Sequence, residues 1–486
     1  MSFISTNIVP IAAAGVGGDA SYVAKYSGPS GVTGGGGQDS KVFAMTDLQD
    51  GTVGIWHVAN LYNTSPTRDA AGYSRIKVAD GTLLISKAQN LNSQSNNTKA
   101  FYASDSGLQF VFGRFHDGTG GVDGVQVFDK DGTMNNPDHV FIHPNSNVFA
   151  IHPTSGRMFY AYGGDRLGGA VYDTTSGWTK FYEAVWNQGG NFKNLVWHGS
   201  KLCGWLEYNS GMHSMKFSAA SNATSLSLDL TRQEPNFNTF SQNTTGFLTM
   251  QDDATDLCMV SNRNNRYSIV RHSGSSFTPS DAFEMERTVS INSFTSYIDC
   301  TGVMIDRAAQ SNYVYSYGRI RWRPSWAAGS AGDQSRGSVF LIQHNFSDLS
   351  INKVLAITLI TPHASADTGT NTGMGDNSNL SMHLLNDDSS IIMSLFKNKG
   401  TNLKGEQDLY VIKIPTDFTS FTLGDYNNLK IEDITSTINS VANPGVNSNA
   451  TYVRNYTISS ATPDAAVEDT VTQFATQSFT TNIVTI

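Results

Sequence analysis

Residues 195–217 read LVWHGSKLCGWLEYNSGMHSMKF, which is three short apolar runs separated by polar turns. Leu195–Trp197 and Leu202–Leu206 flank a turn centred on Gly199, and Met215–Phe217 follows a longer polar loop. Apolar and aromatic runs of this length, broken by Gly, Ser and Asn, are typical of consecutive antiparallel strands. The segment therefore predicts a small β-meander. Helical periodicity is hard to find anywhere in the chain.

Two further segments repeat this order of strand, short turn, strand, loop and strand. The first contains the runs Phe247–Met250, Leu257–Val260 and Tyr267–Val270. The second contains the runs Met382–Leu385, Ile391–Phe396 and Leu409–Ile414. Cys203 and Cys258 occupy the same place in two of the three copies, which indicates that both are buried residues of a repeated unit.

Eight turns mark the repeats, centred near residues 51, 107, 156, 199, 253, 302, 345 and 388, with the one at 345 the weakest. Their mean spacing is about 48 residues, which falls in the range of β-propeller blades. A four-stranded blade cannot bury both of its faces alone, so blades stacked around an axis complete one another's core. We predict an all-β fold, a single β-propeller of seven or eight blades with extended terminal arms. Tandem β-sandwich domains are the alternative, because the same short strands would also build them.

The composition agrees with a turn-rich β protein and excludes several classes of function. Charged residues make up 15% of the chain, 45 residues are glycine, and 39% are hydrophobic. With a net charge of −9 and scattered Lys and Arg, no nucleic-acid surface is expected, because phosphate binding needs clustered positive charge. No apolar run approaches the roughly 18 residues of a membrane helix, so no membrane insertion is expected. No basic residue precedes Lys25, so no signal peptide is expected either.

We divide the chain into three parts. Residues 1–38 form an N-terminal arm with a Gly-rich loop, residues 39–420 the propeller body, and residues 421–486 a C-terminal extension with a docking tag. Within the extension, Asn427–Ser440 is expected to contain one short helix. Ser440–Asp469 is poor in large apolar residues and is expected to run extended over a surface.

The two ends of the chain share a sequence. Ser2–Ile11 reads SFISTNIVPI, and Ser478–Ile486 reads SFTTNIVTI. Both copies are uncharged and rich in β-branched residues, so each is suited to add a strand to a sheet that another segment completes. The alternative is that both are edge strands of one fold. We interpret both as assembly arms. The predicted docking residues are Phe3, Asn7, Ile8, Val9, Phe479, Asn482, Ile483 and Val484.

Two motifs raise the question of a metal site. Asp129 and Asp131 stand at alternate positions before Gly132, as in a calcium loop, but the third acid that such a loop uses is absent. We interpret this motif as an Asp-Gly hairpin turn. Three histidines, His139, His143 and His152, also lie close in sequence, but two of them precede prolines, as residues at strand ends do. No metal site and no cofactor are predicted.

Glycan chemistry has candidates but no motif. Four carboxylates at predicted strand ends could serve a glycoside hydrolase, although no motif fixes their separation. They are Asp105, Asp165, Glu183 and Glu207. We therefore predict no catalytic residue. Trp178, beside Ser-Gly, and Trp326, within PSWAAG, are the tryptophans expected to be most exposed, and they are the candidate glycan contacts.

Over its full length the chain resembles virion structural proteins of tailed bacteriophages. The resemblance lies in its Gly-, Asn-, Ser- and Thr-rich β composition, its low charge, the missing signal peptide and the uncharged terminal arms. It implies a protein made in the host cytoplasm and assembled into a virion as a tail, fibre or head-decoration component. The implied partners are other virion structural proteins, further copies of the chain in a homo-oligomer, and a host surface glycan. No family motif is present, so no functional residue is carried over.

The sequence thus predicts a non-enzymatic structural or adhesion component of a phage virion, anchored through its terminal segments. The alternative is a glycan-binding lectin or glycoside hydrolase on a propeller scaffold. Release of reducing sugar from a host polysaccharide would distinguish the two.

Overall fold

The structure is a computed structural model. It describes residues 9–11, 21–27, 42–58, 70–92, 99–115, 122–142, 148–162, 166–186, 191–198, 201–208, 211–218, 224–234, 247–249, 256–263, 266–273, 278–305, 313–327, 336–360, 381–384, 390–397, 408–447, 452–453, 458–463, 466 and 468–469. These residues form an almost entirely β structure.

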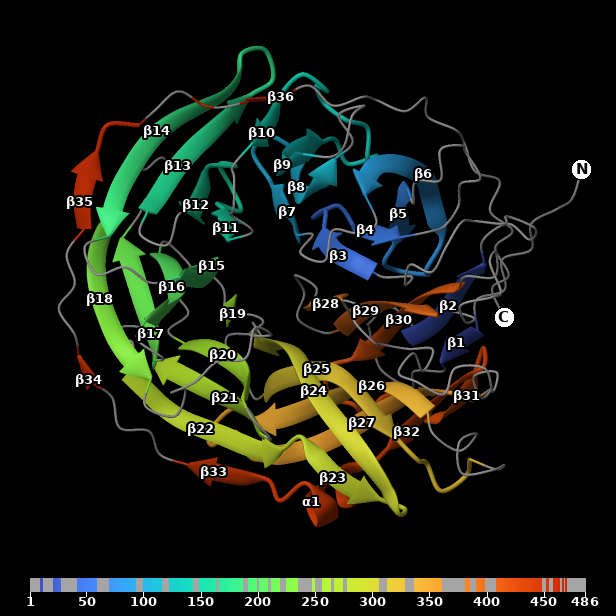
Figure 1. Cartoon of the computed structure of the whole chain (residues 1–486). Coiled ribbons are helices and arrows are strands. Elements are labelled where there is room, and N and C mark those ends of the chain that lie inside the picture. The colour runs from blue at the N-terminus through green and yellow to red at the C-terminus, as the bar shows by residue number, and fades with distance from the viewer. Residues whose placement is uncertain are drawn as a thin grey trace, which may run out of the picture.

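Seven four-stranded blades surround a central axis in a closed ring (Figure 1). Blade 1 contains β3 (Val42–Asp47), β4 (Thr52–Val58), β5 (Ala70–Lys77) and β6 (Leu83–Asn92). Blade 2 contains β7 (Lys99–Ala103), β8 (Leu108–Phe115), β9 (Val122–Phe128) and β10 (Val140–Ile142). Blade 3 contains β11 (Phe149–Ile151), β12 (Met158–Tyr162), β13 (Arg166–Asp173) and β14 (Gly177–Trp186). Blade 4 contains β15 (Asn191–His198), β16 (Lys201–Tyr208), β17 (Gly211–Ser218) and β18 (Ser227–Glu234).

The remaining three blades complete the ring. Blade 5 contains β19 (Phe247–Thr249), β20 (Asp256–Arg263), β21 (Arg266–Ser273) and β22 (Thr278–Glu286). Blade 6 contains β24 (Phe294–Ile305), β25 (Tyr313–Trp322), β26 (Arg336–Asn345) and β27 (Ile351–Leu359), with β23 (Thr288–Ile291) paired to the start of β24. Blade 7 contains β28 (Ser381–Leu384), β29 (Ser390–Lys397), β30 (Asp408–Pro415) and, from the other end of the chain, β2 (Ser21–Ser27). The first strand of each blade lies innermost and contacts the innermost strand of the next blade.

The N-terminal segment closes the ring. β2 pairs with β30 from Tyr22 opposite Lys413 to Ser27 opposite Asp408, so it supplies the fourth strand of the last blade. β1 (Val9–Ile11) then pairs with the outer edge of β2. The described strands within residues 1–38 therefore belong to the ring itself.

The core lies between the blades, because the sheet of each blade packs against a neighbouring blade on both of its faces. In β29, Ile391 and Met393 pack in one cluster with Leu341 of blade 6, whereas Ile392 packs with Val53 of blade 1. This two-residue alternation explains why the sequence shows short, almost continuous apolar runs. Cys203 of β16 is buried, as the repeat predicted.

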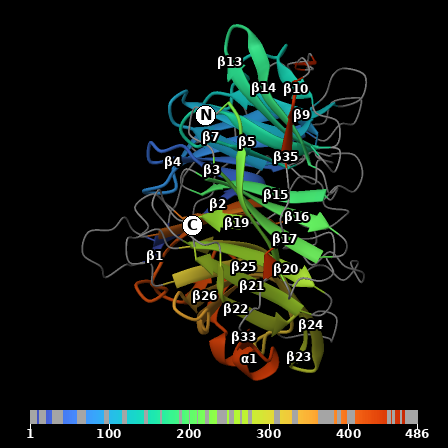
Figure 2. The same cartoon turned by 90° about the vertical axis from the view of Figure 1, so that its left-hand side faces the viewer.

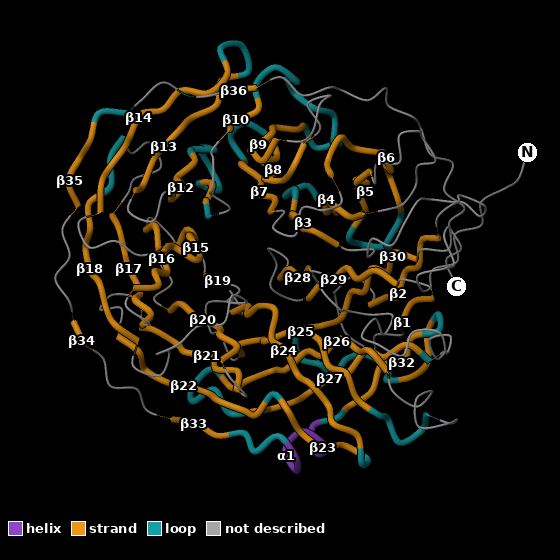
Figure 3. Tube along the Cα trace, viewed as in Figure 1, coloured by secondary structure: helices purple, strands orange, loops and turns teal. Residues whose placement is uncertain are grey.

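After blade 7 the chain turns back and adds outer strands to the blades in reverse order. These elements, called the belt below, are β31 (Gly424–Tyr426), β32 (Leu429–Asp433), α1 (Thr435–Val441), β33 (Gly445–Asn447), β34 (Tyr452–Val453), β35 (Ile458–Ala461) and β36 (Glu468–Asp469). β32 pairs with blade 6, β33 with blade 5, β34 with blade 4, β35 with blade 3 and β36 with blade 2, always antiparallel. The belt follows the rim in Figures 1 and 3, and Figure 2 shows β33 and β35 from the side.

The blade count resolves to seven because two of the predicted turns fall in one blade. The turns near residues 51, 107, 156, 199, 253 and 388 each join the first and second strands of a blade. Gly302 instead lies within β24 at a β-bulge, and Asn345 ends β26 at a turn between the third and fourth strands of the same blade. The β23 hairpin lengthens blade 6, which disturbed the period there. The short helix predicted within Asn427–Ser440 is α1, which has seven residues. In the described part of the chain, no helix has the length and apolar character needed to cross a membrane.

Candidate functional site

A carboxylate of the belt ties blade 2 to blade 3. One oxygen of Glu468 accepts a hydrogen bond from Nδ1 of His139 over 2.7 Å, and the other accepts from the backbone N–H of Trp178. The indole Nε1 of Trp178 donates in turn to the carbonyl of His139 over 3.1 Å. Gly177 makes room for this arrangement, because a Cβ there would lie 2.5 Å from both Glu468 and His139. We call these residues the Glu468 clamp.

The clamp corrects the prediction for Trp178. Its side chain is only 4% exposed, since its ring packs against Phe110, Phe141 and Tyr172. The expectation that Trp178 is exposed to a glycan is therefore wrong. The physical reason is that the ring lies between blades 2 and 3, where aromatic side chains of both blades surround it.

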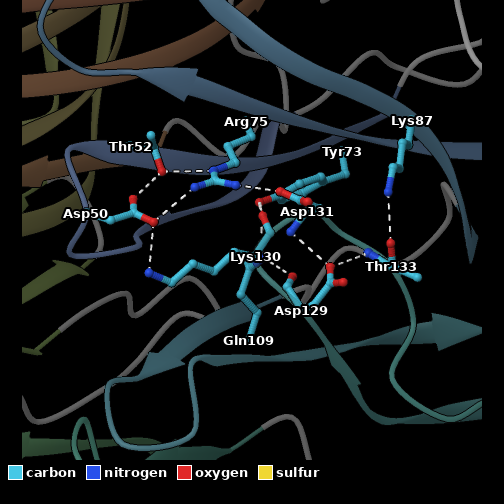
Figure 4. A network of polar contacts seen from close by, with 10 residues as sticks. All are labelled: Asp50, Thr52, Tyr73, Arg75, Lys87, Gln109, Asp129, Lys130, Asp131 and Thr133. Atoms are coloured by element: carbon cyan, nitrogen blue, oxygen red, sulfur yellow. Dashed lines mark hydrogen bonds and ion pairs between the residues drawn. The ribbon is translucent and has the colours of Figure 1, made fainter.

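A network of polar contacts joins a turn of blade 1, between β3 and β4, to a turn of blade 2 that follows β9 (Figure 4). Arg75 of β5 pairs with Asp50 over 2.9 Å and also with Asp131, and Lys130 pairs with Asp50 over 2.8 Å. Partial burial opposes the ionisation of Asp50, but hydrogen bonds from Lys130 and Thr52 lower its pKa overall. The charges of this network offset one another, so it holds two blades in register rather than presenting a charged surface.

A buried polar chain continues this network inward. Gln109 of β8 donates to the Tyr73 hydroxyl over 3.0 Å and to the carbonyl of Asp129 over 2.8 Å. Its side-chain oxygen accepts from the indole of Trp56 over 3.3 Å. Burial raises the pKa of Tyr73, so this hydroxyl stays protonated and can donate, as it does to the carbonyl of Lys130.

The Asp129 motif is a turn, as the sequence predicted. Oδ1 of Asp129 accepts hydrogen bonds from the backbone N–H groups of Asp131 and Thr133, at 2.9 and 2.7 Å. Gly132 has a φ of +71°, which favours glycine. The Asp129 carboxylate, which would be a ligand in a calcium loop, thus caps the backbone of its own turn.

The two described histidines of this cluster, His139 and His152, do not share a site. His139 belongs to the clamp, and His152 packs edge-on against Trp197 while its Nδ1 accepts from the backbone of Thr154 over 3.2 Å. His143 lies outside the described residues. Within the described ranges, no three His, Cys, Asp or Glu side chains gather closely enough to hold a metal ion.

The predicted carboxylates form no described pair. Asp105 is exposed on the turn between β7 and β8. Glu183 is buried in β14 and pairs with the half-exposed Arg166 over 2.6 Å. Burial, followed by a hydrogen bond with Glu183, raises the pKa of the neighbouring Tyr162 to about 12. Asp165 and the side chain of Glu207 lie outside the described residues.

Blade 6 carries an exposed aromatic side chain beside positive charge. Tyr297 of β24 is 51% exposed and lies opposite Arg321 of β25. The guanidinium groups of Arg321 and Arg323 lie 5.5 and 5.3 Å from the centre of the Phe294 ring, close enough for cation–π contact. We call Phe294, Tyr297, Arg321 and Arg323 the blade 6 surface. It combines a ring that can stack on a sugar with cations that can pair with an acidic group.

Trp326, the second tryptophan predicted to contact a glycan, is partly exposed beside the belt. Its indole Nε1 donates to Glu432 of β32 over 2.8 Å, and Lys430 lies 5.6 Å from its ring centre. Burial raises the pKa of Glu432, although Trp326 and Lys430 favour its charged form. The indole N–H of Trp326 thus helps to hold the belt on blade 6.

The predicted docking residues are mostly beyond the described part of the chain. Val9 belongs to β1, where it lies opposite Val23 of β2 in the same chain. The others, Phe3, Asn7, Ile8, Phe479, Asn482, Ile483 and Val484, lie outside the described residues. Their docking role stays a prediction.

No protein-family model and no curated protein matches the chain. Solved structures that it resembles include the Dos1 propeller, with a TM-score of 0.39, 10% identity, and coverage of 79% of this chain and 95% of that one. NanB sialidase from Streptococcus pneumoniae gives a TM-score of 0.37, 10% identity, and coverage of 81% and 71%. Polysaccharide lyase Uly1 gives 0.39, 9% identity, and coverage of 80% and 98%. Because these TM-scores are low, the fold of this chain rests on its own strand pairings, and no activity is carried over.

Sequence reasoning missed Glu468, Glu432 and Tyr297. Glu468 is one of the few acids in a long polar stretch, which was a weak sign that it has a specific partner. Its partner His139 is 329 residues away, so nothing local could identify the pair. Tyr297 stands two residues before Asp299 in an ordinary strand pattern, with no local sign of exposure.

Proposed function

We propose that this protein is a non-enzymatic structural or adhesion component of a phage virion. The observation that carries the proposal is the belt, because a long stretch of chain serves to tie five blades together at the rim. Within the Glu468 clamp the ionisable groups pair with each other, and the same is true within the network in Figure 4. Such a reinforced ring suits a particle component that must stay assembled outside the cell. The phage assignment itself rests on the resemblance in composition.

The proposal predicts that the protein is a fixed part of a particle. Antibody labelling and mass spectrometry of purified phage particles should find it in constant ratio to the other virion proteins. Deleting Ser478–Ile486 and measuring incorporation tests whether the C-terminal copy anchors it. Recovery of the intact protein only as free molecules, with particles complete without it, would refute the structural role.

We propose the blade 6 surface as the part that contacts a host glycan, with acidic sugars preferred. Tyr297→Ala should reduce retention on an immobilised acidic polysaccharide about fivefold, since an aromatic contact is worth about 1 kcal/mol. Trp326→Ala tests the second candidate, and Leu423→Ala, which removes an exposed apolar side chain elsewhere, is the matched control. Unchanged retention in Tyr297→Ala would exclude this surface. Release of reducing sugar by the wild type would instead favour the hydrolase alternative.

A further inference from the structure

Among the described residues, blade 1 has no added strand on its outer edge. β6 pairs with β5 along its inner edge and meets β8 of blade 2 only where Leu91 lies opposite Phe115. Leu84 on this strand is 48% exposed. An open strand edge carries a row of N–H and C=O groups that can pair with another strand, and proteins normally cover it. Within the described ranges, the outer edge of β6 is therefore available to a further strand, apart from its contact at Leu91.

The belt leads toward this edge. Its strands cover blades 6, 5, 4, 3 and 2 in that order, and the next blade in the series is blade 1. Successive belt strands are joined by short connections, since Tyr452 follows Asn447 by five positions and Glu468 follows Ala461 by seven. Residues 470–486 follow directly after β36 and are long enough to reach the neighbouring blade.

The sequence shared by the two ends indicates which residues of that segment pair. In the N-terminal copy, Thr-Asn-Ile precedes Val9-Pro10-Ile11, and these three residues form β1, the fifth strand of blade 7. In the C-terminal copy, the same Thr-Asn-Ile leads into Val484-Thr485-Ile486. One copy thus already acts as an outer strand on this propeller.

We propose that the outer edge of β6 is a strand-acceptor site and that its occupant is Val484–Ile486 of the same chain, in place of the assembly-arm role that the sequence predicted for this copy. With this strand in place, all seven blades have a fifth strand: blade 7 from the N-terminal copy, blade 1 from the C-terminal copy, and the other five from the belt. Val484 follows β36 by fifteen positions in the same chain, and this tether favours the chain's own segment over a free partner, because it raises the effective concentration of that segment.

Hydrogen exchange followed by mass spectrometry tests the proposal. The amides of residues 83–90 should exchange at least tenfold faster in a chain that ends at Gln477 than in the full chain, whereas those of β14 should not change. Adding the peptide SFTTNIVTI to the shortened chain should restore protection. Equal exchange of residues 83–90 in the two chains would overturn the proposal.

Two proline substitutions supply a matched pair that avoids truncation. Val484→Pro removes a backbone N–H at the position equivalent to Val9 and should raise the exchange of residues 83–90 as much as the truncation does. Thr485→Pro reproduces the Val-Pro-Ile of β1 and should leave that exchange within twofold of wild type. Equal effects of the two substitutions would overturn the assignment of Val484–Ile486.

The same site could be filled by a neighbouring copy instead. Sedimentation of the full chain should then show a dimer that the truncation abolishes, and protection of residues 83–90 should fall on dilution. That result would overturn the intrachain occupant. A monomer whose protection is independent of concentration supports it, whether or not the protein is found in particles.

Discussion

The junction between blades 1 and 2 and the junction between blades 5 and 6 bury apolar side chains, but they differ in what surrounds that core. At the first, Trp56 and Phe128 pack beneath a polar network that begins at the buried Gln109 and ends at surface ion pairs. At the second, Phe283 and Phe340 lie in an apolar cluster that extends outward to Ile438 of α1.

This difference between the two junctions indicates that one mainly stabilises the fold and the other mainly fixes the alignment of its blades. Apolar burial stabilises roughly in proportion to area and hardly depends on salt. Ion pairs near the surface contribute little free energy, but hydrogen bonds such as those of Gln109 are satisfied in only one relative position of two blades. We infer that the second junction contributes more to stability, and that the first fixes how its blades are aligned.

The largest expected effect is at the apolar junction. Phe283 is fully buried and packs edge-on against His344, with ring centres 4.6 Å apart. Phe283→Ala should lower the free energy of unfolding by about 3–5 kcal/mol through lost burial and the cavity it leaves. Urea unfolding followed by circular dichroism measures this. Tyr297→Ala, at an exposed position, should cost less than about 0.5 kcal/mol, and a similar loss in both variants would contradict the ranking.

Acid should act next, through the same junction. Nδ1 of His344 donates to the carbonyl of Leu349 and its Nε2 accepts from the hydroxyl of Ser316, so the ring is held neutral. Burial lowers its pKa to about 4, and burial also lowers the pKa of His57 in blade 1 to about 4. Because the folded pKa lies below the unfolded value of about 6.5, this contribution is complete above pH 6.5 and is lost as pH falls toward 4.

Each histidine should therefore account for roughly 3 kcal/mol of that loss. His344→Asn should reduce by about half the fall in unfolding free energy between pH 6.5 and 4, and His57→Asn should have a similar effect through blade 1. Asp50, whose pKa is lowered, loses its contribution only at more acid pH, below its usual value of 3.8. Urea unfolding at pH 7, 5.5 and 4 measures the slopes, and an unchanged slope in His344→Asn would count against this account.

The smallest effect is expected in the polar network. Arg75→Met removes two ion pairs whose acids are partly exposed, and should cost about 1 kcal/mol at low salt. The cost should fall to less than half at about 0.5 M salt, because screening weakens exposed pairs. Phe283→Ala provides the control, since its cost should be the same at both salt concentrations. A salt-independent cost for Arg75→Met would show that its packing, rather than its charge, stabilises the junction.

The turns of the repeat could be predicted because their glycines have a local cause. Gly51, Gly107 and Gly156 each have a φ between +69° and +76°, so glycine is favoured whatever surrounds it. Gly302 has a different cause. A Cβ there would lie 2.4 Å from the Tyr317 hydroxyl, so that glycine provides room at a bulge. A single sequence cannot separate these two causes, so Gly302 was predicted to mark a turn although it lies within a strand.

The contacts of the candidate site could not be predicted from the sequence, because they join residues that are far apart along the chain. The expectation that Trp178 is exposed failed because its cover comes from Phe110, Phe141 and Glu468, which are distant in sequence. The extended character of Ser440–Asp469 was visible, since it lacks large apolar residues. The blade to which each of its strands would pair was not, because two- to four-residue strands carry too little pattern to specify a partner.

The reversed course of the belt has a consequence for how the protein is made. Synthesis proceeds from the N-terminus, so blade 2 emerges before blades 3 to 6, yet β36, which covers it, emerges after the strands that cover the others. Of the five blade edges that the belt covers, the edge of blade 2 is therefore synthesised first and covered last. Among these five edges, β10 therefore spends the longest time on the ribosome open to pairing with other nascent chains, and of the five it is the edge that a chaperone would protect most effectively.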